Sequence, residues 1–162
     1  MAESAATRRK EKSLGYVFDV GAEIVTDQEH VCLGKRVPLD AVLAAVSLLP
    51  RPVTLFVEGT SIADEVQSVL ARHEIAPGRS DLSGTRWPRS QQFHVSVTDS
   101  LMEELQRLAE TLAEPEVLDH LVAYDASGHV QLAAYDAGFD PIWIARDLPP
   151  SVARRIAVMA QS

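Results

Sequence analysis

His120 and Asp136 form the first pair of residues whose types and spacing could support chemistry. They lie on the two arms of a β-hairpin predicted over 117–136, with its turn at Asp125-Ala126-Ser127-Gly128. Asp opens such a turn through its side chain, and Gly closes it in the left-handed conformation. The register that keeps Gln131 off the apolar face places His120 and Asp136 on that face, roughly diagonal to each other. It opposes Leu118, His120, Val122 and Tyr124 to Asp136, Ala134, Leu132 and Val130, in that order.

A catalytic or metal-binding role would need further groups around this pair. A carboxylate beside an imidazole fixes its tautomer and raises its basicity, and Glu116, Asp119 or Asp140 could extend the pair towards a metal-dependent hydrolase. However, a metal site requires three or more ligands that converge on one point, and the chain has no G-x-S-x-G nucleophile motif. We therefore expect a half-buried histidine that is hydrogen-bonded to a neighbour. We predict no catalytic residue, no metal site and no cofactor.

The loop Glu58-Gly59-Thr60-Ser61 is a candidate for binding a small ligand or a phosphate. It follows the apolar run Val53–Val57, which is typical of a central strand, and precedes a predicted helix. Gly59 would permit close approach, Thr60 and Ser61 offer hydroxyl groups, and N–H groups at a helix start favour anions. The chain nevertheless has neither a Walker motif nor G-x-G-x-x-G, and Glu58 would repel an anion. The favoured interpretation is an ordinary capped turn from strand to helix.

A long loop is predicted over 77–91, where Gly and Pro interrupt the apolar pattern. Arginine side chains bind phosphates or carboxylates in a bidentate manner, and a tryptophan can stack on a base or on a partner's side chain. Side chains on such a loop are more often solvated than organised. We include four of them as ligand-binding candidates: Arg79, Arg86, Arg89 and Trp87.

Acidic residues are concentrated between Asp99 and Asp140, where Arg107 is the only Arg or Lys. The formal net charge of the chain is −8, which argues against general nucleic-acid binding, because duplex affinity comes chiefly from neutralising phosphates. An acidic surface can instead steer a basic partner. We therefore predict a non-enzymatic protein-interaction module for a basic macromolecule, such as an inhibitor, an immunity-type antidote or a regulatory adaptor. The predicted partner-binding face consists of Glu103, Glu104, Glu110 and Glu114.

The strands and helices predict an α/β domain with a mixed sheet and packed helices, in the order β-β-α-β-α-β-α-β-β-β-α. Alternating residues predict a first strand over Leu14–Val20 and a second over either Glu23–Thr26 or Val31–Leu33. Early alternation of strands and helices points to crossover connections, and the later hairpin adds antiparallel pairing. Ile142 and Ile144 predict a last strand, with Trp143 on its other face.

Four helix starts can be read from proline and capping residues. Pro38 suits a first turn, because its missing N–H costs nothing there. Ser61 is expected to cap the next helix, with Asp64 completing a box-like pattern, and Ser100 with Glu103 forms a capping pair for the third. A last helix follows Pro149 and Pro150, and each helix carries one apolar stripe.

The composition fits one domain over 13–162 behind a flexible tail over 1–12. Of the 162 residues, 46% are hydrophobic and 23% charged, which is ordinary for a globular protein. No apolar run approaches the roughly 18 residues of a membrane span, and the N-terminus lacks the apolar region of a secretory signal. We expect a soluble cytoplasmic protein without membrane association, and the excess of Arg over Lys is typical of GC-rich bacterial genomes. Cys32, the only cysteine, is expected to be buried filler, and a homodimer through an edge strand stays open.

Overall fold

The computed structural model describes residues 25, 28–75 and 90–161. Six strands form one sheet in the order β1-β6-β5-β4-β2-β3, and all neighbouring strands are antiparallel. The strands are β1 (His30–Leu33), β2 (Thr54–Gly59), β3 (Gln91–Ser96), β4 (His120–Tyr124), β5 (Val130–Ala134) and β6 (Ile142–Ala145). The helices are α2 (Leu39–Leu48), α3 (Asp64–Arg72), α4 (Asp99–Ala109), α5 (Glu114–Val117) and α6 (Pro150–Gln161).

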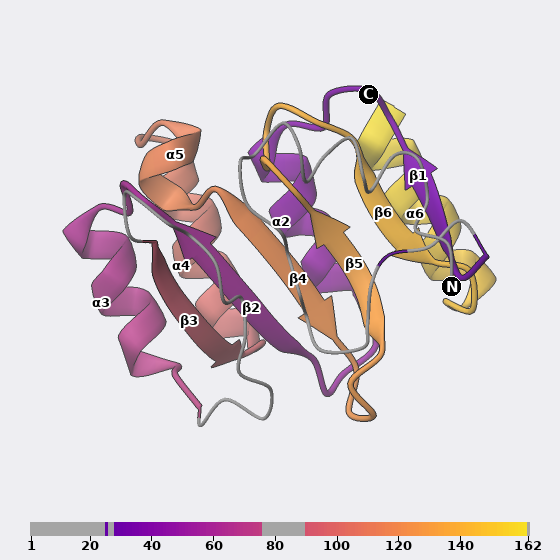
Figure 1. Cartoon of the computed structure of the whole chain (residues 1–162), viewed down its shortest axis with the longest axis horizontal. Helices are drawn as coiled ribbons and strands as arrows, with labels where there is room; N and C mark the ends of the chain where they lie inside the picture. Colours follow the sequence, from indigo (N-terminus) through magenta and orange to yellow (C-terminus); the bar gives the residue numbers. More distant parts are fainter. Residues whose placement is uncertain (1–24, 26–27, 76–89, 162) are drawn as a thin grey trace.

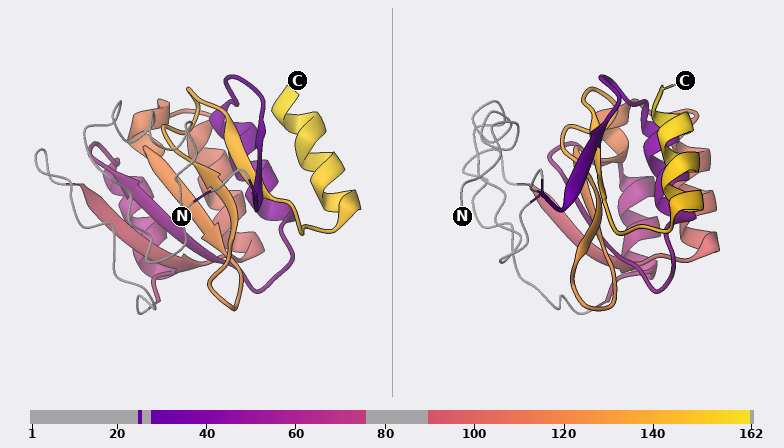
Figure 2. Two further views of the ribbon diagram at one scale, coloured as in Figure 1. Left: turned by 45° about the vertical axis from the view of Figure 1, so that its right-hand side comes forward. Right: turned by 90° about the vertical axis from the view of Figure 1, so that its right-hand side faces the viewer.

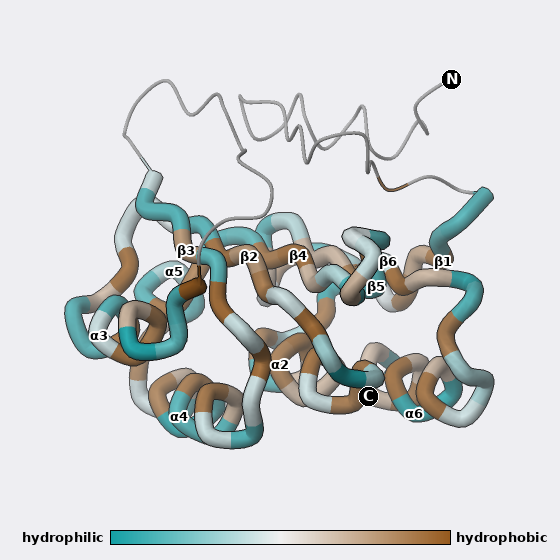
Figure 3. The backbone as a smooth tube through the Cα atoms, turned by 90° about the horizontal axis from the view of Figure 1, so that it is seen from below, coloured by the Kyte–Doolittle hydropathy of each residue, from teal (hydrophilic) through white to brown (hydrophobic). Residues whose placement is uncertain are grey.

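Helices α2, α3, α4 and α6 lie along one face of the sheet (Figures 1 and 2). Figure 3 shows the two layers edge-on, with the row of strands above the row of helices. The short helix α5 lies at the end of the sheet where β2 ends and β4 begins (Figure 1). This arrangement confirms the predicted α/β class, with helices packed on a sheet.

The crossover connections are present, but they join strands that are not neighbours. Successive antiparallel pairings give β1 and β2 the same direction, with β6, β5 and β4 between them. Likewise β3 and β4 share a direction, with β2 between them. Parallel strands must be joined by a long connection, and here α2 and the α4–α5 segment supply it. Strands β4, β5 and β6 lie between β1 and β2, and β2 lies between β3 and β4, so the described sheet contains no parallel neighbours, unlike the mixed sheet that we expected.

The start of α3 is fixed by a tertiary contact rather than by the predicted cap. The helix begins at Asp64, and the preceding Ala63 offers no capping side chain. The N–H of Ala63 instead donates to the carbonyl of Glu116 (2.8 Å), which ties this turn to α5. The prediction that Ser61 caps the helix is therefore wrong. By contrast, α2 starts directly after Pro38, as predicted.

Helix α4, in contrast to α3, starts earlier than predicted, before its expected capping pair. The hydroxyl oxygen of Thr98 accepts a hydrogen bond from the N–H of Leu101 (3.1 Å), so Thr98 is the N-cap. Ser100 and Glu103 both lie inside the helix, and the predicted pairing between them is wrong. Helix α5 was not predicted, because Pro115 suggested the end of a helix. In the structure Pro115 lies in the first turn of α5, where proline is well tolerated.

Of the two alternatives for the second strand, Val31–Leu33 is confirmed as part of β1. The predicted strand over Leu14–Val20 lies outside the described residues, as does Glu23–Thr26 apart from Val25. The tail over 1–12 also lies outside them. The run Val53–Val57 is confirmed as the buried strand β2, which continues to Gly59.

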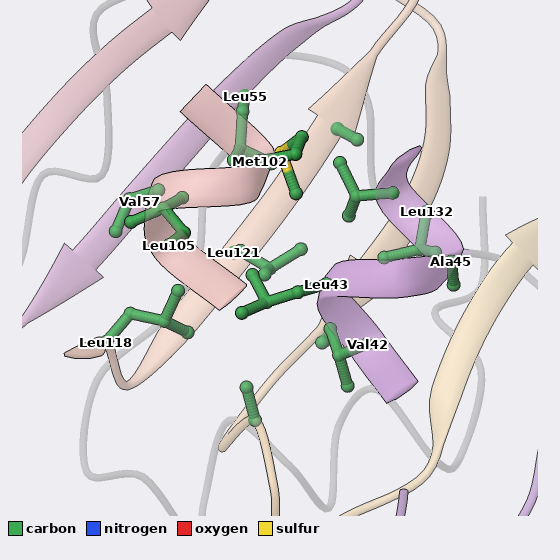
Figure 4. Packing of buried hydrophobic residues seen from close by; sticks show 14 of the residues in the cluster. Val42, Leu43, Ala45, Leu55, Val57, Met102, Leu105, Leu118, Leu121 and Leu132 are labelled. Carbon is green, nitrogen blue, oxygen red and sulfur yellow. The ribbon is translucent and has the colours of Figure 1, made fainter. Parts of the chain in front are cut away.

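The main core fills the space between the helices and the sheet. Leu43 of α2 and Leu105 of α4 meet Leu55 of β2 and Leu121 of β4 there, and all four are fully buried (Figure 4). Burying one such side chain contributes about 1.5–3 kcal/mol before entropy is counted. The predicted apolar stripes of these two helices therefore hold the helical layer on the strands.

A second apolar cluster lies on the other face of the sheet. Phe56 belongs to it, whereas its neighbours Leu55 and Val57 belong to the main core, because successive strand residues point to opposite faces. Trp143 is buried in the same cluster, away from Ile142 and Ile144. The predicted alternation at Trp143 is confirmed, and the sheet is buried on both faces.

The hairpin turn forms as predicted around the carboxylate of Asp125. Its Oδ1 accepts hydrogen bonds from the N–H of Ser127 (2.9 Å), the hydroxyl of Ser127 (2.6 Å) and the N–H of His129 (2.9 Å). Its Oδ2 accepts one from the side chain of Gln131 (3.2 Å). Burial raises the pKa of Asp125, but these hydrogen bonds and the nearby imidazole outweigh it, so the pKa lies below its usual value.

The register of the hairpin agrees with the prediction only next to the turn. Tyr124 pairs with Val130 as expected, but a bulge then shifts the pairing by one residue. Ala134 therefore opposes Leu121, and the predicted pairing of His120 with Ala134 is wrong. The extra residue is accommodated at Gln131, whose amide bonds to the Asp125 carboxylate.

We expect Asp125→Ala to lower the free energy of unfolding by about 1–2 kcal/mol at pH 7, because the turn loses its acceptor in a partly solvated position. The pKa of Asp125 is lowered in the folded state, so the charge-dependent part of this stability is fully present above the unfolded-state pKa of about 3.9. It is lost as the pH falls through the folded-state pKa. Urea unfolding of the wild type and the variant between pH 7 and pH 3 would show the difference shrinking on acidification. A difference that grows instead would contradict the assignment, and Asp147→Ala, at an exposed site, is the control.

Candidate functional site

Four connecting segments meet at the end of the sheet where β2 ends and β4 begins (Figure 1). The N–H of Asp119 donates to the carbonyl of Glu58 (2.9 Å), and the N–H of Ala137 donates to the carbonyl of Asp119 (2.8 Å). The N–H of Val37 donates to the carbonyl of Asp140 (3.2 Å). We call this region the loop end of the sheet; it comprises the connections and adjoining helix ends over 34–40, 59–65, 107–119 and 135–141.

Both donors of Thr60 in the predicted ligand loop are already occupied by Asp119. Its Oδ2 accepts hydrogen bonds from the N–H of Thr60 (2.9 Å) and from the Thr60 hydroxyl (3.2 Å). The missing side chain of Gly59 makes room for Ile62, since a Cβ there would lie 2.7 Å from Ile62 Cγ1. Ser61 is exposed. The loop thus binds an internal carboxylate where the sequence suggested an external anion.

Glu58 and His120 lie side by side on the sheet face that carries the second cluster. They are directly opposed in the β2–β4 register, and opposed residues of an antiparallel pair project to the same side with Cβ atoms about 5 Å apart. Glu58 is 1% exposed and His120 is 3% exposed. The prediction of a half-buried histidine is therefore wrong, because the imidazole is fully enclosed.

His120 contacts Asp136 through the backbone and not through the carboxylate. The N–H of Asp136 donates to His120 Nδ1 (2.8 Å), so Nδ1 carries no proton. The neutral ring then holds its proton on Nε2. The sequence suggested that the Asp136 side chain sets this tautomer, but the main chain sets it, because the bulge moves Asp136 past the end of the β4–β5 pairing.

The turn after β5 presents an aromatic side chain at the loop end. Asp136 has φ +54° and Gly138 has φ +93°, and the N–H of Phe139 donates to the carbonyl of Asp136 (3.0 Å). Phe139 is 43% exposed, and the guanidinium of Arg36 lies 5.1 Å from its ring centroid. Arg36 Nε also donates to the carbonyl of Gly138 (3.2 Å), which holds the turn against the segment after β1.

Carboxylates gather at the loop end, where they outnumber the basic side chains, and most of them come from 110–119 and 135–141. Among the described residues, the bases in this region are Lys35, Arg36 and Arg107 of the last turn of α4. The acids are Asp40, Asp64, Glu65, Glu110, Glu114, Glu116, Asp119, Asp136 and Asp140. We call this set the acidic end.

The four acids of the predicted partner-binding face are divided by the structure. Glu110 and Glu114 belong to the acidic end, with Glu110 exposed just after α4. Glu103 is exposed nearer the start of α4, seven residues or about 10 Å before Glu110. Glu104 is only 23% exposed and forms an ion pair with Arg72 of α3. Exposure and ion pairing therefore separate residues that the sequence grouped.

The other candidates contribute little to this region. Arg79, Arg86, Trp87 and Arg89 lie outside the described residues. Within the part of the chain that the structure describes, no group of three or more His, Cys, Asp or Glu could hold a metal ion. Cys32 is exposed on β1, so the expectation that it is buried filler is wrong.

No family model matches this sequence, and searches of curated proteins and of solved structures gave no significant match. Among the described residues, no helix combines the length and the apolar character that crossing a membrane would need.

Sequence reasoning missed the Thr60–Asp119 bonds, the stacking of Arg36 on Phe139 and the contact between Glu114 and Gly138. Each joins residues far apart in the chain. One local signal was available: the run Asp136-Ala-Gly-Phe-Asp140 places Gly between acids directly after a strand, which is typical of a tight turn.

Proposed function

We propose that this protein is a non-enzymatic protein-interaction module whose acidic end binds a basic macromolecular partner. The observation that supports it is the gathering of acids from four chain segments at one end of the sheet, where few bases accompany them. Carboxylates that converge in this way give a local field stronger than the net charge alone would, and such fields accelerate encounter with a partner of opposite sign. An inhibitor, an antidote or a regulatory adaptor in the cytoplasm would each use such a surface.

The alternative of a phosphate or small-ligand site at 58–61 receives less support from the geometry. Both donors of Thr60 bond to Asp119, and the following helix begins with Asp64 and Glu65. An incoming anion would have to displace one carboxylate and approach two more. A hydrolase that uses His120 as its base also receives less support, because Nδ1 already accepts a backbone hydrogen bond.

A pair of charge-reversal variants tests the proposal at constant net charge. We expect Glu65→Lys with Glu110→Lys to weaken partner binding at least about tenfold, and Glu103→Lys with Asp147→Lys to change it less than about twofold. Both double variants replace two exposed carboxylates, so they alter the net charge equally and differ only in place. The partner is captured at low salt, identified by mass spectrometry, purified and titrated calorimetrically.

The salt dependence supplies a second readout for the same proposal. The association rate constant of the wild type should fall steeply between low and physiological ionic strength, and that of the first double variant should fall less. Equal weakening by both double variants would show that net charge matters and the acidic end does not. Failure to capture any basic macromolecule would remove the proposal.

A further inference from the structure

The turn that carries Phe139 at the acidic end is held by a hydrogen bond that only a neutral histidine can accept. His120 Nδ1 accepts from the N–H of Asp136 at 2.8 Å, and His120 is 3% exposed. A protonated imidazole carries hydrogen on both nitrogens and is a donor at each. Protonation of His120 would therefore set two N–H groups against each other at this contact, and the hydrogen bond would be lost.

The backbone conformation of Asp136 makes the turn sensitive to this loss. Asp136 holds a left-handed conformation at φ +54°, which is unfavourable for a residue with a side chain and persists only where surrounding contacts impose it. One of those contacts is the bond to His120. Further contacts on this turn are the hydrogen bonds from Ala137 to Asp119, from Phe139 to Asp136, from Val37 to Asp140 and from Arg36 to Gly138.

The charged and titratable groups around His120 come from both neighbouring strands. Among the described residues, Glu58 of β2 directly opposes it, and the buried Glu58 carboxylate would favour a charged imidazole. Tyr135 and Asp136 follow β5 on the other side, and Asp119 precedes His120 with its carboxylate bonded to Thr60. A buried histidine thus lies between an acid that stabilises its charged form and a backbone N–H that requires its neutral form.

We propose that protonation of His120 releases the turn over 135–140 and thereby switches the surface that displays Phe139, Asp136 and Asp140. This inference concerns regulation of the acidic end, so its relevance to binding rests on the proposed function. Histidine changes charge between pH 5 and 8 in its ordinary range, which makes a response to mild acidification accessible. On acidification the turn loses its anchor to β4, Phe139 leaves its place beside Arg36, and the arrangement of carboxylates at the acidic end changes.

The test follows the backbone amides and the imidazole nitrogens of the full chain by NMR from pH 8 to pH 5.5. At pH 8 the His120 ring should show a proton on Nε2 alone. On acidification the hydrogen-exchange protection of the Asp136 amide should fall about tenfold, with the same pH midpoint as the protonation of the His120 ring. The NMR chemical shifts of Phe139 should change over the same pH range. This range stays above the pH at which aspartate side chains ordinarily titrate.

Two matched variants complete the design. His120→Gln offers a side-chain oxygen to the Asp136 N–H but does not titrate, so it should abolish the transition; His129→Gln, at an exposed histidine of the same hairpin, should preserve it. The inference is overturned if His120 stays neutral while the protein is folded, if Asp136 does not respond, or if the response survives in His120→Gln. If that variant does not fold, the wild type still tests the inference. The pH midpoints of the His120 ring and of the Asp136 amide must then agree, and different midpoints overturn the inference.

A binding measurement separates this inference from the proposed function. A synthetic oligo-arginine peptide is titrated against the wild type and His120→Gln at pH 8 and pH 5.5. Affinity for the wild type should fall several-fold at the lower pH and that for His120→Gln should not. Absence of binding at both pH values would count against the proposed function, whereas binding with an unresponsive turn would overturn the inference alone.

Discussion

Leu121→Ala is expected to lower the free energy of unfolding by about 3–4 kcal/mol, the largest effect among the substitutions considered. Leu121 is fully buried in β4, where it pairs with Val57 on one side and Ala134 on the other. Figure 4 shows it facing Leu43 of α2 between the two layers. Removing its three outer carbons takes away transfer free energy and leaves a cavity, because strands on both sides prevent collapse.

Urea denaturation followed by circular dichroism measures this change directly. The slope with denaturant should stay constant while the midpoint falls, as expected when the native state weakens without a change in exposed surface. Val158→Ala is the control, because Val158 is 69% exposed and should change the stability by less than about 0.5 kcal/mol. A loss below about 1 kcal/mol for Leu121→Ala would show that β4 is not packed as described.

Gly34→Ala is expected to cost about 3 kcal/mol, because two separate penalties coincide at this residue. Its φ of +74° is a conformation that residues with a side chain rarely adopt. A Cβ there would also lie 2.7 Å from the backbone oxygen of Ala160 in α6, and a main-chain atom yields less readily than the end of a side chain. The substitution should therefore loosen α6 from the end of β1.

Gly128→Ala provides the matched comparison for this second prediction. Gly128 also has a positive φ, +87°, but it closes the hairpin turn and is partly exposed. It should show only the conformational penalty, about 1 kcal/mol. Equal losses for the two variants, measured by thermal or urea unfolding, would mean that the contact between Gly34 and Ala160 is not tight.

Local features of the fold were predictable from short stretches of sequence. The hairpin turn at Asp125–Gly128 depends on one carboxylate and one glycine within four residues, and it forms as expected. The apolar stripes of α2 and α4 follow from helical spacing, and both face the sheet. In both cases the interactions that decide the local structure join residues close together in the sequence.

Features that depend on distant partners could not be predicted. The bulge at Gln131 shifts the hairpin by one residue, and it is the reason that His120 meets the main chain of Asp136. The start of α3 depends on Glu116, and the ligand loop is filled by Asp119. None of these partners is marked by local propensity: Glu116 and Asp119 meet the segment after β2 only when β2 and β4 pair, and Asp136 meets His120 only in the shifted β4–β5 register.

For this protein the sequence alone determined most of the segments that become strands and helices, since the period of the apolar residues decides which face can be buried. It also determined that the later part of the chain is acidic. Only the tertiary structure decided where those acids lie: antiparallel pairing brings the segments before β4 and after β5 to the end where β2 finishes, while ion pairs occupy Asp99 and Glu104 elsewhere. The physical reason is that a strand's direction and neighbours, which no local stretch specifies, set the end of the sheet at which its flanking residues emerge.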